Sequence, residues 1–156
     1  MPATVKMIGS IDEAIELVGQ ELGIGQWKLI DQHRIDEFAE VTEDHQWIHV
    51  DTERVKAETA QGSTIAHGFL TLSLIPALSK DNYSFENRKM GLNYGLNKVR
   101  FLAPVPVDSR VRVRSELIHA ARISDTAVNI TIRHTVELEG SEKPAAIAEL
   151  VTRAIW

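Results

Sequence analysis

The chain has 156 residues, of which 44% are hydrophobic and 25% charged, and its formal net charge is −5 at pH 7. This length and composition predict one globular domain spanning residues 1–156. The negative charge argues against nucleic acid as a partner, because phosphate binding needs a basic surface. The sequence contains no cysteine, which excludes disulfides and thiolate-ligated zinc and fits a cytoplasmic location.

The first elements predicted along the chain are a helix and a short strand. Ser10 and Glu13 form a capping-box pattern, and apolar residues recur at helical spacing as far as Leu22. We therefore expect a helix that starts at Ser10 and ends at the glycine that follows, Gly23. A short strand is expected over 26–30.

Helical and loop segments continue through the first half. Asp31 is placed to cap a second helix, and residues 42–50 form a polar loop before a short charged helix over 52–60. Residues 67–78 predict a helix that is apolar nearly all round and hence buried on every side, with Pro76 at a kink or in its last turn. This helix is shorter than the about 20 apolar residues that cross a membrane, so we expect no membrane segment.

The second half changes to segments rich in Val, Ile and Thr. Four strands are predicted, over 93–102, 110–119, 127–139 and 145–155. No helix lies between them, so the strands are expected to be antiparallel. The pattern predicts an α+β fold in which an antiparallel sheet curls around the long central helix.

The polar loop contains the residues best suited to catalysis. A carboxylate and two imidazoles, Asp44, His45 and His49, lie within six positions in a chain with only 6 histidines. Asp44 and His49 can converge on one water, which the carboxylate deprotonates as general base while the imidazole orients it. Each such proton transfer contributes about 10²–10⁴-fold to a rate.

The start of the apolar helix supplies a second catalytic element. A backbone N–H at a helix N-terminus can stabilise the oxygen of a developing enolate. Gly68 has no side chain, so a ligand can approach its N–H closely. The flanking residues Ala66, His67 and Phe69 are then expected to contact the substrate.

Two structural alternatives remain open for these residues. His67, at the start of a buried helix, fits a structural histidine as well as a functional one. Glu43, Asp44, His45 and His49 can alternatively bind a metal ion, because His45 and His49 have i,i+4 spacing.

Three segments resemble MaoC-like (R)-specific enoyl-CoA hydratases. The loop around Asp44 and His49, with Phe38 ahead of it, is similar to the family's Gly-Asp-x-Asn-Pro-x-His signature. TIAHGFLTLSLI, over 64–75, resembles the central helix, and NKVRFLAPVPVDSRV, over 97–111, resembles the strand and turn that follow. The chain is most similar to the short, single-hot-dog members of actinobacteria. It departs from the signature at three positions of the loop: Glu43, Gln46 and Trp47 replace Gly, Asn and Pro.

The resemblance implies a hot-dog fold, usually a homodimer with one continuous sheet. It implies reversible addition of water to trans-2-enoyl-CoA, giving (R)-3-hydroxyacyl-CoA, with Asp44 and His49 activating the water and the Gly68 N–H binding the thioester oxygen. No metal or redox cofactor is expected. The implied substrate-binding residues flank these three positions; they are Gln46, Ile65, Ala66, His67, Phe69, Asn97 and Lys98.

Two other functions fit the same fold. Hot-dog thioesterases also combine an acidic residue with a helix-end oxyanion donor, so the fold does not separate them from hydratases. A non-catalytic acyl-thioester-binding subunit is the third candidate. The histidine five positions after Asp44 favours the hydratase.

Overall fold

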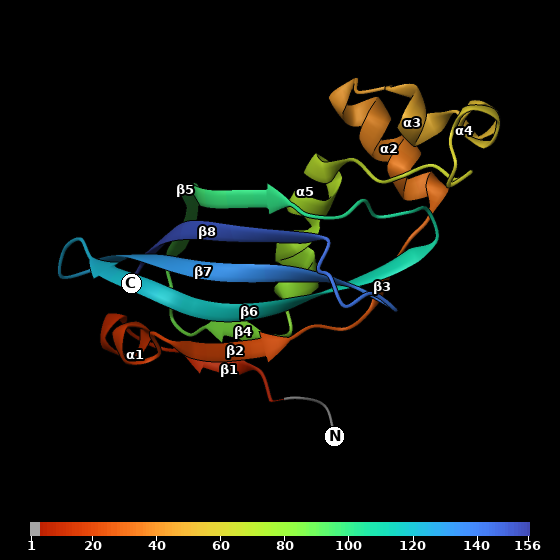
Figure 1. Ribbon diagram of the computed structural model, residues 1–156. Helices are drawn as coiled ribbons and strands as arrows, with labels where there is room; N and C mark the ends of the chain where they lie inside the picture. Colours follow the sequence, from red (N-terminus) through yellow and green to blue (C-terminus); the bar gives the residue numbers. More distant parts are fainter. Residues whose placement is uncertain (1–3) are drawn as a thin grey trace.

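A computed structural model describes residues 4–156 of the chain. Figure 1 shows an antiparallel sheet with the long helix α5 packed on one of its faces, and three helices gathered near the start of α5. The elements in chain order are β1 (Lys6–Ile8), α1 (Ile11–Glu16), β2 (Gln20–Ile24), β3 (Lys28–Ile30), α2 (Gln32–Thr42), α3 (Trp47–Val50), α4 (Thr52–Glu58), α5 (Gly68–Ser79), β4 (Tyr83–Phe85), β5 (Met90–Phe101), β6 (Ser109–Arg122), β7 (Ala127–Leu138) and β8 (Ala146–Ile155).

The main sheet has six strands in the order β2-β6-β7-β8-β5, with β3 also pairing along β6. Every pair in it is antiparallel. Along most of β6 and β7 the buried inward positions alternate with half-buried ones, as the sequence alternation predicts. The four long strands lie within a few residues of their predicted bounds, and the α+β hot-dog arrangement is confirmed.

Helix α5 packs against β6, β7 and β8 through a buried face that includes Leu70, Ile75 and Leu78. Pro76 lies in its last turn, as expected. The prediction that this helix is buried on every side is wrong for the single chain, because Phe69 is 67% exposed and Pro76 is also exposed. The sheet covers only one face of the helix, so the opposite apolar face stays open.

The predicted first helix ends too late. Ser10 does cap it, since its Oγ accepts a hydrogen bond from the Glu13 N–H at 3.1 Å. However, α1 ends at Glu16, and Gly19 then adopts a φ of 87°, a left-handed conformation that favours glycine. Leu22 is buried on strand β2, which pairs with β6. Leu22 therefore belongs to the strand that follows the helix, although its spacing fits the helix pattern.

Strands β1 and β4 form a separate parallel pair that the sequence pattern does not indicate. Each has three residues, too few to show alternation. Ile8 on β1 is completely buried and joins a second apolar cluster with Leu117, Val128 and Ile130 under the far end of the sheet. The pair therefore closes the end of the fold where α5 finishes.

The three helices α2, α3 and α4 form an overhang near the N-terminus of α5 (Figure 1). Asp31 caps α2 as predicted, because its Oδ1 accepts from the Arg34 N–H at 2.9 Å. Gln32 on α2 connects two segments. Its Nε2 donates to the His49 carbonyl on α3 at 2.8 Å, and its Oε1 accepts from Thr64 Oγ1, in the segment before α5, at 2.6 Å. Within residues 4–156, no helix has the length and apolar character needed to cross a membrane.

Candidate active site

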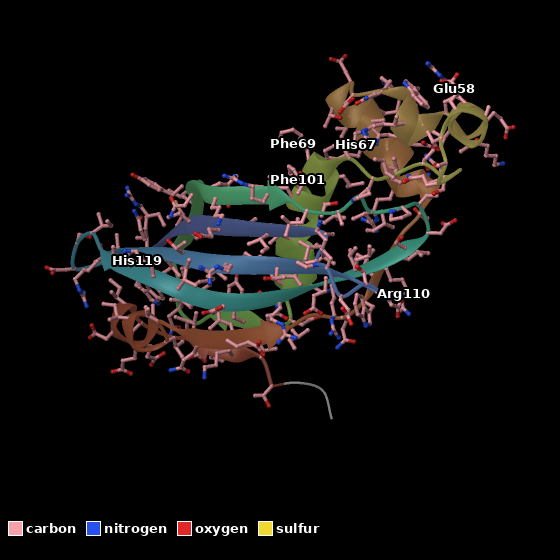
Figure 2. The ribbon with its side chains drawn as sticks, in the orientation of Figure 1. Glu58, His67, Phe69, Phe101, Arg110 and His119 are labelled. Carbon is pink, nitrogen blue, oxygen red and sulfur yellow. The ribbon has the colours of Figure 1, made fainter. Side chains whose placement is uncertain are left out.

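Three side chains from separate elements meet beneath the overhang. Asp44 follows the end of α2, His49 lies in α3, and His67 directly precedes α5. Ligand-capable atoms of all three lie within 4.8 Å of one another. Figure 2 shows His67 at the start of α5, next to Phe69 and Phe101. The structure thus brings together the two residues predicted to share a water and adds His67 to them.

His49 is buried and held in one orientation by the backbone. Its Nδ1 lies 2.7 Å from the Ile65 carbonyl, which can only accept, so Nδ1 carries the proton and Nε2 keeps its lone pair. Burial lowers the pKa of His49, and nearby His67 lowers it further, against the opposing effects of the Ile65 carbonyl and Asp44. A neutral imidazole with a free Nε2 lone pair can accept a hydrogen bond from water.

His67 is fixed in the same manner. Its Nε2 lies 3.0 Å from the Asp44 carbonyl, while its Nδ1 is buried with no hydrogen-bond partner among residues 4–156. The ring stacks on His49 with centroids 3.9 Å apart and lies 5.0 Å from the Phe38 ring. His67 therefore contacts both the Asp44 backbone and the His49 ring, and it packs between them and Phe38.

Asp44 presents its carboxylate toward solvent at the edge of this cluster. Glu43 before it adopts a left-handed conformation, with φ 60° and ψ 19°, which turns the chain sharply at the end of α2. This is the position where the resembling family has glycine, which adopts such a conformation without strain. The turn is what brings Asp44 back over His49.

A cavity of ≈ 300 Å³ lies against His49 and the start of α5. It is mostly apolar, and Ile65, Ala66 and Gly68 are among the residues that line it. The Gly68 N–H belongs to the first turn of α5, whose N–H groups have no partner within the helix. An added Cβ on Gly68 would lie 3.2 Å from the Phe101 ring, so only glycine leaves this entry open.

The other residues predicted to contact the substrate do not line this cavity. Phe69 is exposed and meets Phe101 edge to face at 6.2 Å, while Gln46 is exposed at the start of α3. Asn97 and Lys98 are exposed on β5 and do not line the cavity in the single chain. Their contact with substrate stays a prediction.

The metal-binding alternative draws on a different set of residues from the one that gathers. His45 pairs with Glu40 at 3.5 Å on the exposed side of the overhang, and Glu43 is exposed. The set that converges is Asp44, His49 and His67.

The chemistry of the sequence does not single out several residues of this cavity, because most of them are apolar. They come from α5, from the end of β5 and from the segments that follow; they are Thr71, Phe101, Leu102, Ala103, Pro104, Val105 and Ala145. The Arg-Phe-x-x-Pro-Val run in the third resembling segment contains Phe101, Pro104 and Val105, and it was the available signal.

Comparison with known proteins identifies what this arrangement is similar to. The family model described as MaoC like domain matches residues 14–138. A 3-hydroxyacyl-thioester dehydratase Z of Mycobacterium tuberculosis is 47% identical over 146 residues, which cover 94% of this chain and 96% of the relative. Nodulation protein N of Rhizobium meliloti is 44% identical, covering 93% and 91%. Among solved structures, an (R)-hydratase from A. caviae involved in PHA biosynthesis matches with a TM-score of 0.68 and 25% identity, covering 86% of this chain and 94% of that one.

Proposed function

The chain belongs to the MaoC like domain family and is a hydro-lyase, and from this membership we propose that it reversibly hydrates trans-2-enoyl-CoA to (R)-3-hydroxyacyl-CoA. The observation that supports this reaction most directly is the cluster of Asp44, His49 and His67 beside the free N–H of Gly68. The relative with 47% identity is named for the reverse direction, removal of water from a 3-hydroxyacyl thioester. A single equilibrium connects the two directions.

The proposed reaction begins with a water held between Asp44 and His49. The Asp44 carboxylate takes a proton from this water as its oxygen bonds to C3 of the enoyl group. The electron pair of the double bond moves toward the thioester oxygen, where the Gly68 N–H stabilises the enolate charge. The proton taken up by Asp44 is then delivered to C2 on the same face, so that Asp44 returns to its starting state, one water is added in syn fashion and no cofactor is consumed.

The role proposed for His49 follows from its tautomer. Because Nδ1 donates to the Ile65 carbonyl, Nε2 accepts a hydrogen bond from the water and directs the water's oxygen toward C3. A protonated His49 would lose this acceptor. The lowered pKa of His49 favours the neutral ring, whose Nε2 can accept.

Loss of enoyl absorbance from crotonyl-CoA, after addition of the purified protein, tests the proposal. We expect Asp44→Asn and His49→Gln each to reduce the hydration rate by about 10²–10⁴-fold. Glu40→Gln is the matched control, since this exposed carboxylate on α2 lies outside the cluster. The hand of the 3-hydroxy product is determined in the same reaction. Release of free CoA without hydration would instead identify a thioesterase, and acyl-CoA binding without turnover a binding subunit.

We also propose that the protein is a homodimer joined through β5. This strand is the edge of the main sheet and is exposed along nearly its whole length. It presents the large apolar side chains Met90, Leu92, Tyr94 and Leu96, each 45–59% exposed. A long apolar edge strand is normally covered by another chain. We expect sedimentation to give twice the monomer mass, and Leu92→Lys to shift the protein toward monomer.

A further inference from the structure

A second cavity, here called the distal cavity, lies at the opposite end of α5 from Asp44 and His49. Its volume is ≈ 320 Å³, and it is enclosed by the last turn of α5, by β4 and β5, and by residues of β7 and β8. The charged residues that line it are Lys80 and Arg88, both cations, in a chain whose net charge is −5. No carboxylate of residues 4–156 lines it. This balance favours an anionic ligand.

A buried histidine with a fixed tautomer lines the distal cavity. His134 occupies an inward position of β7, where the neighbouring inward residues are apolar, and it is 1% exposed. Its Nδ1 lies 3.0 Å from Ser115 Oγ, which accepts from Asn82 Nδ2 at 2.8 Å. Within residues 4–156 the buried Ser115 hydroxyl has no other acceptor than Nδ1. It therefore donates to Nδ1, which leaves the proton of the neutral ring on Nε2.

The Nε2–H of His134 is a donor without an acceptor. Burial lowers the pKa of His134 to about 4, so the ring is neutral near pH 7. In the described part of the chain no group accepts from Nε2, although the residue lines the cavity. This nitrogen is not closed off from the cavity, so an acceptor atom of a ligand can reach it there.

Arg88 is held at the rim of the distal cavity by its neighbours. Its guanidinium carbon lies 4.2 Å from the centroid of the Phe85 ring, a cation–π contact. Its Nη1 lies only 2.6 Å from the point that a Cβ on Gly91 would occupy, so glycine at this position makes room for the guanidinium. Tyr83 lines the same cavity with its ring 6.4 Å from that of His134. Donors from the rim, β4 and β7 thus surround one small volume.

An apolar hollow separates the distal cavity from the catalytic loop. Along α5, the hollow at the catalytic end contains Gly68 and Thr71, the middle one contains Leu72 and Pro76, and the distal cavity contains Pro76 and Ser79. Strand β5 lines the same three hollows in the reverse order of its sequence. The series follows the 12 residues of α5, a length of about 18 Å. A long extended acyl chain laid along α5 has the length needed to span the three hollows, which are separate pockets in the described chain.

We propose that the distal cavity binds a carboxylate at the far end of a long acyl chain whose thioester lies at Asp44 and His49. The apolar middle hollow accepts the methylene chain, and Arg88, Tyr83 and His134 bind the terminal carboxylate. This inference rests on the proposed function and names a substrate class for it, the CoA monothioesters of long α,ω-dicarboxylic acids. A free long-chain fatty acid carries the same chemical group and is the alternative source.

A pair of substrates that differ only at the far end tests the proposal. Hydration rates are measured for trans-2-hexadecenoyl-CoA and for the same thioester with a terminal carboxylate. We expect the wild-type kcat/KM to favour the carboxylate-ended substrate roughly tenfold, as a charge-assisted hydrogen bond supplies. Arg88→Gln is expected to bring the ratio near one. Lys89→Gln, a neighbouring exposed lysine that does not line the cavity, is the control and should retain the preference.

The outcomes separate this inference from the proposed function. A wild-type ratio at or below one, or an unchanged ratio in Arg88→Gln, overturns the inference while crotonyl-CoA hydration still supports the function. If crotonyl-CoA is not hydrated, the proposed function fails. The inference is then decided by calorimetry, as the ratio of the binding affinities of the saturated C16 acyl-CoA with and without a terminal carboxylate. Arg88-dependent binding of free palmitate, without preference between the thioesters, would show a separate anion site and overturn the proposal for the substrate.

Discussion

The imidazole rings of His49 and His67 stack with their centroids 3.9 Å apart and their planes inclined by 27°. Each ring donates one N–H to a backbone carbonyl, of Ile65 and of Asp44 respectively. Two positive charges at this separation repel each other strongly in a partly buried site. The lowered pKa of His49 favours its neutral form, which leaves the Nε2 lone pair of that ring free.

The first prediction concerns the pH dependence of hydration. Burial is the main cause of the lowered pKa of His49, and His67 lowers it further. We expect kcat/KM to fall as the pH drops through a value below 6.5, the ordinary pKa of histidine. In His67→Gln this acidic limb should move to higher pH, because one of the effects that lower the pKa is removed. His45→Gln, outside the cluster, should leave the limb in place; a limb unmoved in His67→Gln would contradict the coupling.

The second prediction concerns the entry at Gly68. An alanine Cβ there would lie 3.2 Å from the Phe101 ring, so Gly68→Ala should displace the ring or the first turn of α5. We expect a loss of hydration rate of about 10–100-fold, since small misplacements of a reacting group are costly. Adding Phe101→Leu should recover part of that loss, because the smaller side chain relieves the contact. Losses that multiply independently in the double variant would argue against a steric cause.

The third prediction concerns backbone strain next to Asp44. Glu43 has φ 60°, a conformation that costs a non-glycine residue about 1 kcal/mol or more. Glu43→Gly should therefore increase the free energy of unfolding by about 0.5–1 kcal/mol, measured by urea denaturation. Glu40→Gly, within the regular part of α2, should instead lower it by about 1 kcal/mol. A loss of stability in both variants would show that Glu43 is stabilised by contacts that outweigh its conformation.

The fourth prediction concerns stability in acid. The folded-state pKa of His134 is about 4, below its unfolded value of 6.5, so the unfolded chain binds a proton first as the pH falls. Stability is thus retained above pH 6.5 and lost between pH 6.5 and 4, by about 3 kcal/mol from this residue. His134→Gln should remove that part of the pH dependence. His33→Gln, whose side chain is 79% exposed, should not change it.

The sequence predicted the elements whose periodicity is long enough to read. The strands β5 to β8 each have ten or more residues, and the alternation of Val and Ile in β6 and β7 reflects the inner face of the sheet. Leu22 lies on β2 and not on α1, although its spacing in the sequence continues the apolar stripe of α1. Strands β1 and β4 pair with each other across a long separation in sequence, which no local pattern indicates.

The candidate site was predictable where chemistry identifies a residue. Asp44 and His49 stood out because a carboxylate and an imidazole were close in sequence, and the structure brings them together with His67. Phe101 was missed because an aromatic residue at the end of an apolar strand looks like any core residue. Its role depends on Gly68, which is 33 positions away in sequence and meets it only in the folded chain.

Strands β1 and β4 also set how readily one end of the protein opens. Their parallel pair has three residues on each side and is separate from the main sheet, whereas β7 is hydrogen-bonded along its whole length between β6 and β8. Amide hydrogens of β4 should therefore exchange with solvent through local opening, and those of β7 only through global unfolding. Because β4 contributes Tyr83, Ser84 and Phe85 to the distal cavity, that wall of the cavity should open together with the strand.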